Sequence, residues 1–352
     1  MAGYTRASAL GPISDFVQAR GGSIDRVFRE VDLPLSLLDD PDLPLPLREQ
    51  FKVLSEAGRE IGDAYFGAAL GRVVSMQKLS AFGAWVSGAP TLASGIDRSQ
   101  RGLNRFLQTA TDLEFRVIGS QARWSIRFTD PGADGRFQNE LLGVSYLIDG
   151  VRHFARRAWS PTLIRSTCVG AKQAADLERI FEAPVLHDQP ESSIDFDAAL
   201  LVEKRSRVVR SVLEAEPPIP PPKSYRDDVA ALSTIALLEG QPKIDWVAKK
   251  LDLSRRSLQR VLEAEGCSFS DVLEGLLKDR AVALLRTTEL SLTEIALKLG
   301  YSDSAHFSRA FKRWTRVSPH HFRSRGVDTN EAMPLAHRAN KTAPGLLLQS
   351  SG

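Results

Sequence analysis

Two short stretches near the C-terminal end carry side chains that can bond to nucleic acid. The first contains Arg255, Arg256, Gln259 and Arg260. The second contains Ser304, Ala305, His306, Ser308, Arg309, Lys312 and Arg313. Arginine can bond bidentately to guanine and glutamine to adenine, while lysine and arginine also neutralise phosphates. We therefore expect the first stretch to read bases, and the second to read fewer bases and to make more phosphate contacts.

Charge is distributed unevenly along the chain. From Lys243 to Arg325 there are 16 Lys and Arg against 10 Asp and Glu, a local balance of +6, whereas the whole chain of 352 residues carries only +3. The rest of the chain is therefore slightly acidic. This asymmetry favours a polyanionic partner for the C-terminal part, although charge alone leaves open a solvated basic face without any partner.

The two stretches belong to an internal repeat. The segment WVAKKLDLSRRSLQRVL aligns with EIALKLGYSDSAHFSRAF at an offset of 48 residues, which becomes 49 after a one-residue insertion. Apolar residues recur at helical spacing in both copies, so each copy is predicted to form two short helices joined by a tight turn. The small Ala248 matches Ala296, and both would let the second helix cross close to the first.

The turn of each copy has suitable residue types. Ser254 and Ser302 stand where the second helix needs an N-cap. Gly300 suits the left-handed position of the turn, which Asp252 occupies in the first copy. The sequence thus predicts two helix-turn-helix units, whose second helices can enter major grooves of double-stranded DNA.

The connector between the two units is predicted to be one helix from about Ser270 to Thr287. At a rise of about 1.5 Å per residue this helix is roughly 27 Å long. Successive major-groove faces on one side of DNA lie about 34 Å apart. One chain can therefore place both second helices in adjacent grooves.

Three segments carry a family resemblance: SRRSLQRVLEAEGCSF (254–269), ALKLGYSDSAHFSRAFKRW (296–314) and VSPHHFR (317–323). They closely resemble the DNA-binding domain of AraC/XylS-type transcription regulators. The resemblance covers about 100 residues, and it implies base reading by Arg256, Gln259, Arg260, Ala305 and Arg309.

The resemblance also implies a function, with two departures. Members of this family usually activate transcription by contacting RNA polymerase, and some repress, so we expect a sequence-specific regulator and favour an activator.

Arg316 stands where the family usually has glycine, and it either costs a helix-end turn or adds a phosphate contact. Ala305 cannot hydrogen-bond a base. An architectural DNA binder without an effector is the alternative.

A proline-rich segment, EPPIPPPKS, divides the chain. Five of the six residues from Pro217 to Pro222 are proline, and such a stretch forms a semi-rigid polyproline II spacer. The predicted organisation is an effector-binding and dimerisation domain over 1–216, a linker over 217–224, a DNA-binding domain over 225–326 and a disordered tail over 327–352.

The part before the prolines is predicted to be α+β, and the part after them all-α. Helical periodicity marks residues 91–108, with Thr91 as a possible cap, and a long helix over 137–159. Between them, LEFRVIGSQARWSIRFTD alternates in two arms around Gly119, which predicts a β-hairpin. An amphipathic helix is expected over 201–216.

The order of these elements resembles the arabinose-binding type of effector and dimerisation domain. That resemblance implies a small-molecule effector and a homodimer. Our candidates for the effector site are Trp85, Trp124, Tyr146 and Arg152, within a wider aromatic set that adds Phe82, Phe115, Phe128 and Phe154. Core packing is the alternative role of the aromatic side chains, and a solvated basic face is the alternative for Arg152.

The predicted helix over 201–216 has two alternative roles, because it either pairs two chains or packs on its own domain.

Other classes of protein find less support in the sequence. The two cysteines, Cys168 and Cys267, form no metal-binding spacing, and we expect no metal or cofactor. There is no secretory signal pattern at the N-terminus and no apolar run of about 20 residues, so we expect a cytoplasmic, nucleoid-associated protein rather than a membrane protein.

An enzyme remains one alternative. Ser75 and Lys78 fit the S-x-x-K pattern of serine acyl enzymes, but the accompanying S-D-N and K-T-G motifs are absent. A four-residue match arises by chance in many chains, so we expect a protein that is not an enzyme.

Overall fold

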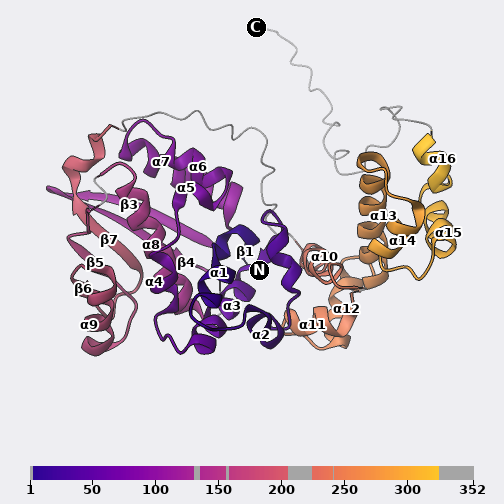
Figure 1. Cartoon of the computed structure of the whole chain (residues 1–352), viewed down its shortest axis with the longest axis horizontal. Coiled ribbons are helices and arrows are strands. Elements are labelled where there is room, and N and C mark those ends of the chain that lie inside the picture. The colour runs from indigo at the N-terminus through magenta and orange to yellow at the C-terminus, as the bar shows by residue number, and fades with distance from the viewer. Residues whose placement is uncertain (1–2, 131–134, 156–157, 205–223, 241, 325–352) are drawn as a thin grey trace, which may run out of the picture. The chain divides into compact units, whose positions relative to one another are not determined.

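The computed structural model describes residues 3–130, 135–155, 158–204, 224–240 and 242–324 (Figure 1). The chain divides into two compact units, and the boundary between them lies between Leu276 and Leu277 in the sequence. The predicted proline linker, most of the predicted 201–216 helix and the predicted tail lie outside the described residues, so the proposed domain boundaries remain predictions. Among the described residues, no helix has the length and apolarity needed to cross a bilayer.

A five-stranded sheet organises the N-terminal part, in the order β3-β4-β7-β5-β6. These strands are β3 (Thr111–Ile118), β4 (Gln121–Phe128), β5 (Leu163–Arg165), β6 (Val185–Leu186) and β7 (Ser192–Asp197). All neighbours pair antiparallel except β5 and β6. A separate pair joins β1 (Tyr4–Arg6) to β2 (Pro44–Pro46).

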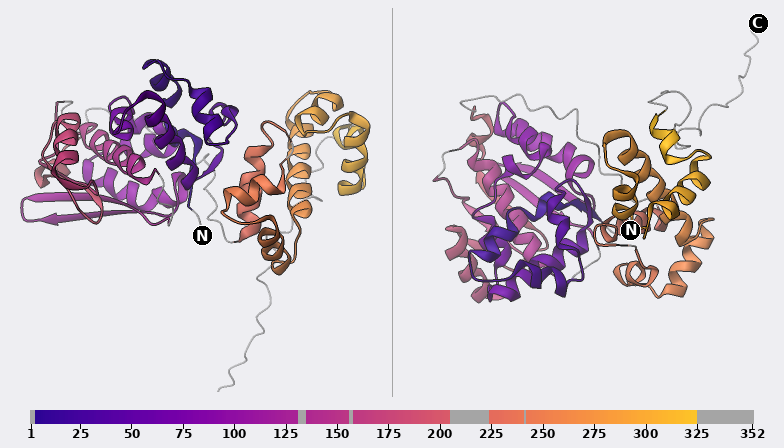
Figure 2. Two further views of the ribbon diagram at one scale, coloured as in Figure 1. Left: turned by 90° about the horizontal axis from the view of Figure 1, so that it is seen from below. Right: turned by 45° about the vertical axis from the view of Figure 1, so that its right-hand side comes forward.

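Helices of the N-terminal part pack against this sheet (Figure 2). They are α1 (Ile13–Gln18), α2 (Ile24–Glu30), α3 (Leu47–Ile61), α4 (Phe66–Gly71), α5 (Met76–Leu79), α6 (Ala81–Ser87), α7 (Leu92–Gly102), α8 (Arg136–Arg152) and α9 (Gly170–Phe181). A π-turn over Leu103–Leu107 extends α7, and 3-10 turns cover Ala7–Leu10, Leu35–Asp39 and Ala198–Val202. The α+β prediction is therefore confirmed.

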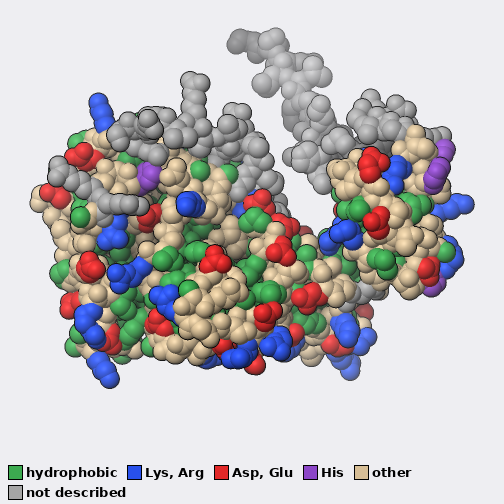
Figure 3. All heavy atoms as spheres, viewed as in Figure 1, with side chains coloured by type: hydrophobic (Ala, Val, Ile, Leu, Met, Phe, Trp, Pro, Cys, Tyr) green, Lys and Arg blue, Asp and Glu red, His purple; other side chains and the backbone are tan. Residues whose placement is uncertain are grey.

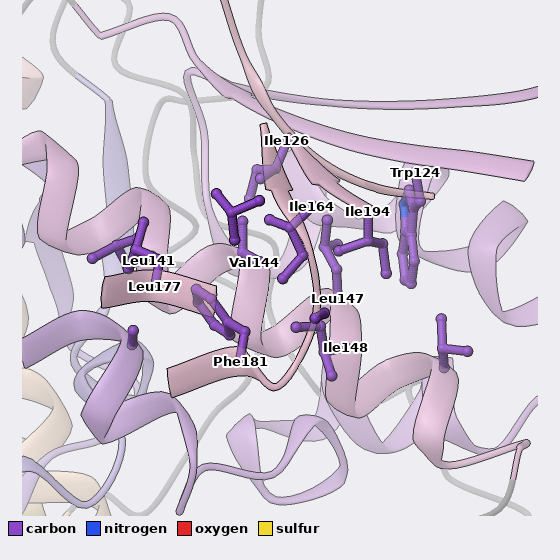
Figure 4. Close-up of a cluster of buried hydrophobic side chains, with 14 of the residues drawn as sticks. Trp124, Ile126, Leu141, Val144, Leu147, Ile148, Ile164, Leu177, Phe181 and Ile194 are labelled. Atoms are coloured by element: carbon purple, nitrogen blue, oxygen red, sulfur yellow. The ribbon is translucent and has the colours of Figure 1, made fainter. Parts of the chain in front are cut away.

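The main hydrophobic core lies between the sheet and α8. Trp124 and Ile126 on β4, Ile164 on β5 and Ile194 on β7 meet Val144 and Leu147 of α8 and Phe181 of α9 (Figure 4). Each of these side chains is at most 7% exposed. Because β4 buries alternate residues, this two-residue period determines which face of the β3–β4 hairpin packs against α8.

Most elements predicted in the N-terminal part are confirmed. The hairpin turns at Gly119, whose φ of +63° lies in the left-handed region, and Thr91 caps α7 by accepting a hydrogen bond from the Ser94 amide at 3.2 Å. The prediction of a helix to residue 159 was wrong, since α8 ends at Arg152. There the chain turns back, and the Trp159 carbonyl accepts a hydrogen bond from Arg152 Nε at 2.8 Å.

The C-terminal part is all-α among its described residues, as predicted. It begins in the first unit with α10 (Tyr225–Ala236), α11 (Ile244–Lys250) and α12 (Arg255–Ala264). The connector forms α13 (Phe269–Thr287), close to its predicted bounds. The second unit contains α14 (Leu292–Lys298), α15 (Ser304–Thr315) and α16 (Pro319–Ser324).

A non-glycine residue ends α15 in the left-handed conformation. Arg316 has φ +66° and ψ 0°, and its amide bonds to the Lys312 carbonyl at 2.9 Å. An L-residue costs about 1–2 kcal/mol in this conformation, and glycine avoids that cost. Of the two expectations for Arg316, the costly helix-end turn is therefore the one seen in the backbone.

We predict that Arg316→Gly stabilises the second unit by about 1 kcal/mol, because it removes this backbone strain. Hydrogen exchange of the α14–α16 amides would measure the change. Arg316→Ala is the matched control, since it removes the same charge and keeps the strain. Equal protection in both variants would show that the charge, and not φ, governs this turn.

Candidate nucleic-acid interface and N-terminal cavity

The first helix-turn-helix unit consists of α11 and α12. Asp252 adopts the left-handed conformation in the turn, with φ +55°. Ser254 then caps α12, because its hydroxyl accepts a hydrogen bond from the Ser257 amide at 3.1 Å. Both turn residues therefore act as the sequence predicted.

Apolar packing sets the orientation of α12. Val247 and Ala248 on α11 and Leu258 and Leu262 on α12 are at most 1% exposed, and they share one cluster with Val229 of α10. The residues that match between the two repeats are thus the buried ones. Because Leu258 and Leu262 face inward, the residues beside them on α12 face solvent.

Four polar side chains occupy the outer face of α12. Arg255, Arg256, Gln259 and Arg260 are all exposed. Arg255 approaches Asp245, with Nη1 3.4 Å from Oδ2. Arg256, Gln259 and Arg260 make no comparable contact with any described residue. Their bidentate groups are therefore available to an external partner.

The second unit repeats this geometry with one difference in its cap. Gly300 takes the left-handed position, with φ +76°. Asp303, not the predicted Ser302, caps α15, since Asp303 Oδ1 accepts a hydrogen bond from the His306 amide at 2.7 Å. The one-residue insertion in this copy lengthens the turn and moves the cap by one position. Ser302 instead donates to Asp303 Oδ2 at 3.1 Å.

The core of the second unit is aromatic where that of the first is aliphatic. Ile295, Ala296, Phe307 and Phe311 are fully buried. The Phe311 ring also meets the Phe322 ring of α16 edge-on, with centroids 5.4 Å apart. These contacts fix α15 against α14 and α16.

The outer face of α15 carries the remaining candidates. Ala305, His306, Arg309, Lys312 and Arg313 are exposed. Ser304 and Ser308 are half-buried. Lys, Arg and His side chains gather at the surface over α15 and α16 (Figure 3). Hydrogen bonds from the His306 amide and Ser302 lower the pKa of Asp303, so a carboxylate stands at the start of this helix.

A cavity of about 60 Å³ lies in the N-terminal part, beside the main core. Trp124 and Tyr146 line it, as do two members of the wider aromatic set, Phe82 and Phe128. Sequence reasoning missed Gln50 on α3 and Asn139 on α8, whose side chains meet there with Gln50 Nε2 2.8 Å from Asn139 Oδ1. The sequence signal that could have identified these two residues is their helical spacing from apolar neighbours on α3 and α8.

Two other candidates lie away from this cavity. Trp85 packs edge-on against Phe106, with ring centroids 6.2 Å apart, and its carbonyl accepts a hydrogen bond from Arg98 at 2.6 Å. Arg152 lines a separate, polar hollow that also includes Asp149. The predicted set of four is therefore split, and only Trp124 and Tyr146 share a site.

Three consecutive residues of α3 face different partners, and all of these partners lie in the N-terminal one of the two compact units. Arg48 Nη1 lies 3.3 Å from Asp252 Oδ2 in the helix-turn-helix turn. Glu49 Oε2 lies 2.6 Å from Lys250 Nζ at the end of α11. Gln50 lines the cavity. The same short segment therefore contacts both the DNA-binding unit and the cavity.

The Glu49–Lys250 pair is almost completely buried. The two side chains are 1% and 4% exposed, and Lys250 also donates to the Val31 carbonyl at 2.6 Å. Burial lowers the pKa of Lys250, and the Glu49 carboxylate opposes that shift. The sequence offered one signal for this contact, since Lys250 follows the buried Val247 by three residues on α11.

A second buried contact joins the start of the chain to α10. The Tyr4 hydroxyl donates to Asp228 Oδ1 at 2.7 Å, and both residues are at most 5% exposed. Burial raises the pKa of Asp228, although the hydrogen bond from Tyr4 opposes the shift. Buried polar contacts thus tie both α10 and α11 to the N-terminal part.

Comparison with known proteins agrees with this arrangement. Residues 21–204 match the family model described as the arabinose-binding domain of AraC transcription regulators, N-terminal, and residues 247–325 match a helix-turn-helix domain. The transcriptional regulator VirS of Mycobacterium tuberculosis is 24% identical over 91% of this chain and 96% of its own length. The ornithine utilization regulator of Pseudomonas aeruginosa is 43% identical over 82 residues, 23% of this chain and 24% of its own length.

Among solved structures, this chain is similar to the transcriptional regulator CdpR of Pseudomonas aeruginosa. The two are 19% identical with a TM-score of 0.38, over 86% of this chain and 96% of that one. Both matching family models describe parts of a transcription regulator, so the serine-hydrolase interpretation of Ser75 and Lys78 gains no support from them. The chain belongs to the AraC-type transcription regulators, with an arabinose-binding-type N-terminal domain and a helix-turn-helix DNA-binding domain.

Proposed function

We propose that this regulator reads two adjacent major grooves, with α12 in one and α15 in the other. The observation that carries the proposal is that both helices bury matching apolar residues and expose arginines at matching positions, Arg260 and Arg309. Arg256 and Gln259 add bidentate groups on α12 that suit guanine and adenine. Ala305 offers only an apolar contact, so α12 supplies most of the sequence reading.

Phosphate contacts fall mainly to α15. Lys312 and Arg313 lie near its C-terminal end and are exposed. His306 lies near its start, 3.2 Å from the Ser302 hydroxyl through Nδ1. Such contacts set register and orientation without specifying sequence, and they make binding salt-dependent.

The regulator is further proposed to respond to a small molecule bound in the N-terminal part. Support comes from α3, where Gln50 lines the cavity while Glu49 and Arg48 contact α11 and the turn after it. A ligand that moves Gln50 would shift the preceding residue as well. Because the ligand would favour one arrangement of these contacts, it would change the affinity of α12 for DNA.

The rest of the proposal follows from the family alone. We expect a homodimer, activation through contact with RNA polymerase, and a cytoplasmic location. The predicted dimerisation helix over 201–216 falls mostly outside the described residues. A DNA binder without an effector is the competing function, and it predicts the same DNA affinity with the cavity filled or empty.

We predict that Arg260→Ala weakens binding to a site selected from random-sequence DNA by about 1–3 kcal/mol and relaxes the preference at one base pair. The reason is the loss of a bidentate contact to a base. Competition binding of the full-length protein at fixed salt would measure the loss.

Lys278→Ala is the control for Arg260→Ala. It removes one positive charge at an exposed position of α13, a helix that carries none of the proposed base-reading residues. An equal loss for Arg260→Ala on unrelated DNA would mean that Arg260 contacts phosphate. No loss on the selected site would contradict base reading by α12.

The buried pair gives a second prediction. Lys250→Met should destabilise the first unit by about 3 kcal/mol, since it leaves the buried Glu49 carboxylate with fewer partners. Lys249→Met is the matched control, because the exposed Lys249–Asp32 pair, 3.2 Å apart, is worth under about 1 kcal/mol.

Chemical denaturation followed by tryptophan fluorescence would compare these variants, since the Trp246 ring lies 5.4 Å from Lys250 Nζ. Similar midpoints for the two variants would show that the Glu49–Lys250 contact does not hold α11. Wild-type stability in Lys250→Met with altered DNA affinity would separate a regulatory contact from a stabilising one.

A further inference from the structure

The cavity beside α3 has a lining that selects for one class of molecule. Its walls are mostly aliphatic and aromatic, and none of the described residues that line it is charged. Moving an ion into such surroundings without a counter-charge is strongly unfavourable. Burial also raises the pKa of the Tyr146 hydroxyl, and the Asp149 carboxylate raises it further, so this phenol stays neutral.

Among the side chains that line the cavity, two polar atoms lack partners in the described residues. They are Gln50 Oε1 and Trp124 Nε1, whose side chains are 2% and 1% exposed. By contrast, Gln108 donates to the Thr111 hydroxyl at 2.8 Å and Ser99 to the Ile96 carbonyl at 2.6 Å. A buried polar atom without a partner is costly, and a ligand that bonds to it removes that cost.

The size of the cavity limits the ligand. One water-sized atom needs about 10–15 Å³ of such volume, so a cavity of about 60 Å³ admits roughly four to six non-hydrogen atoms. A larger molecule would require the surrounding side chains to move.

We propose that the cavity binds a small neutral molecule with an apolar body and one group able to donate and accept hydrogen bonds, such as an alcohol or an amide. The unpartnered Gln50 oxygen accepts from that group, and the Trp124 indole donates to it. The inference rests on the proposed effector response and names its ligand class. Arg152 takes no part in this site, because it lines the separate polar hollow.

Four-carbon probes test the proposal on the full-length protein. 1-Butanol and butyramide are neutral, whereas butyrate and butylammonium have nearly the same shape and carry a charge. Saturation-transfer NMR would measure the affinity of each. We expect the neutral pair to bind at least about tenfold more tightly, because the cavity offers no counter-charge.

Two leucine variants locate the binding. Leu107→Phe places extra volume in the cavity wall and should abolish binding of the neutral probes. Leu54→Phe is the matched control, since Leu54 of α3 is also buried but does not line the cavity. It should bind the probes as the wild type does.

The outcomes separate this inference from the proposed function. Absence of binding by both neutral probes, equal binding by the charged probes, or unchanged binding in Leu107→Phe would each overturn the ligand assignment. The wild-type comparison of four probes stands even if a variant fails to fold. DNA binding is measured without any probe, so its loss would count against the reading helices and not against the cavity.

Discussion

The close crossing of two short helices is the constraint on which each DNA-binding unit depends. Ala248 and Ala296 are at most 1% exposed at these crossings, and a larger side chain there would push the second helix away. The left-handed residue in each turn, Asp252 or Gly300, allows the sharp change of direction. With the helix angle fixed, the same face of α12 and of α15 must point outward. The positions of the exposed arginines follow from packing, not from the arginines themselves.

The two units satisfy this constraint with different interiors. Aliphatic Leu258 and Leu262 hold α12, whereas Phe307 and Phe311 hold α15 and extend its core to α16. Repeats that keep their geometry while changing their core can also change their outer faces independently. This independence agrees with the proposal that the first unit mainly reads bases and the second mainly contacts phosphate.

Polar groups buried between α3 and α11 connect the N-terminal part of the chain to the first helix-turn-helix unit. A buried ion pair contributes little net stability when it replaces an apolar pair, yet breaking it is costly. Glu49–Lys250 is therefore a contact that is costly to break although it adds little net stability. Because Gln50 follows Glu49 directly, a change at the cavity and a change at α11 are separated by one peptide unit. This adjacency is the structural basis of the proposed effector response.

The sequence by itself determined the local features. The repeat predicted both helix-turn-helix units and most of their exposed residues, although Ser304 and Ser308 are half-buried. Alternation predicted the β3–β4 hairpin, and Thr91 and Ser254 were correctly placed as caps. Local rules failed where an insertion moved the second cap to Asp303 and where the chain reversed after Arg152. Tertiary structure alone decided that Trp124 and Tyr146 share a cavity while Trp85 and Arg152 do not, and that Lys250 meets Glu49 across 201 positions of sequence. Periodicity identifies which face of an element is buried, but it carries no information on which distant element covers that face.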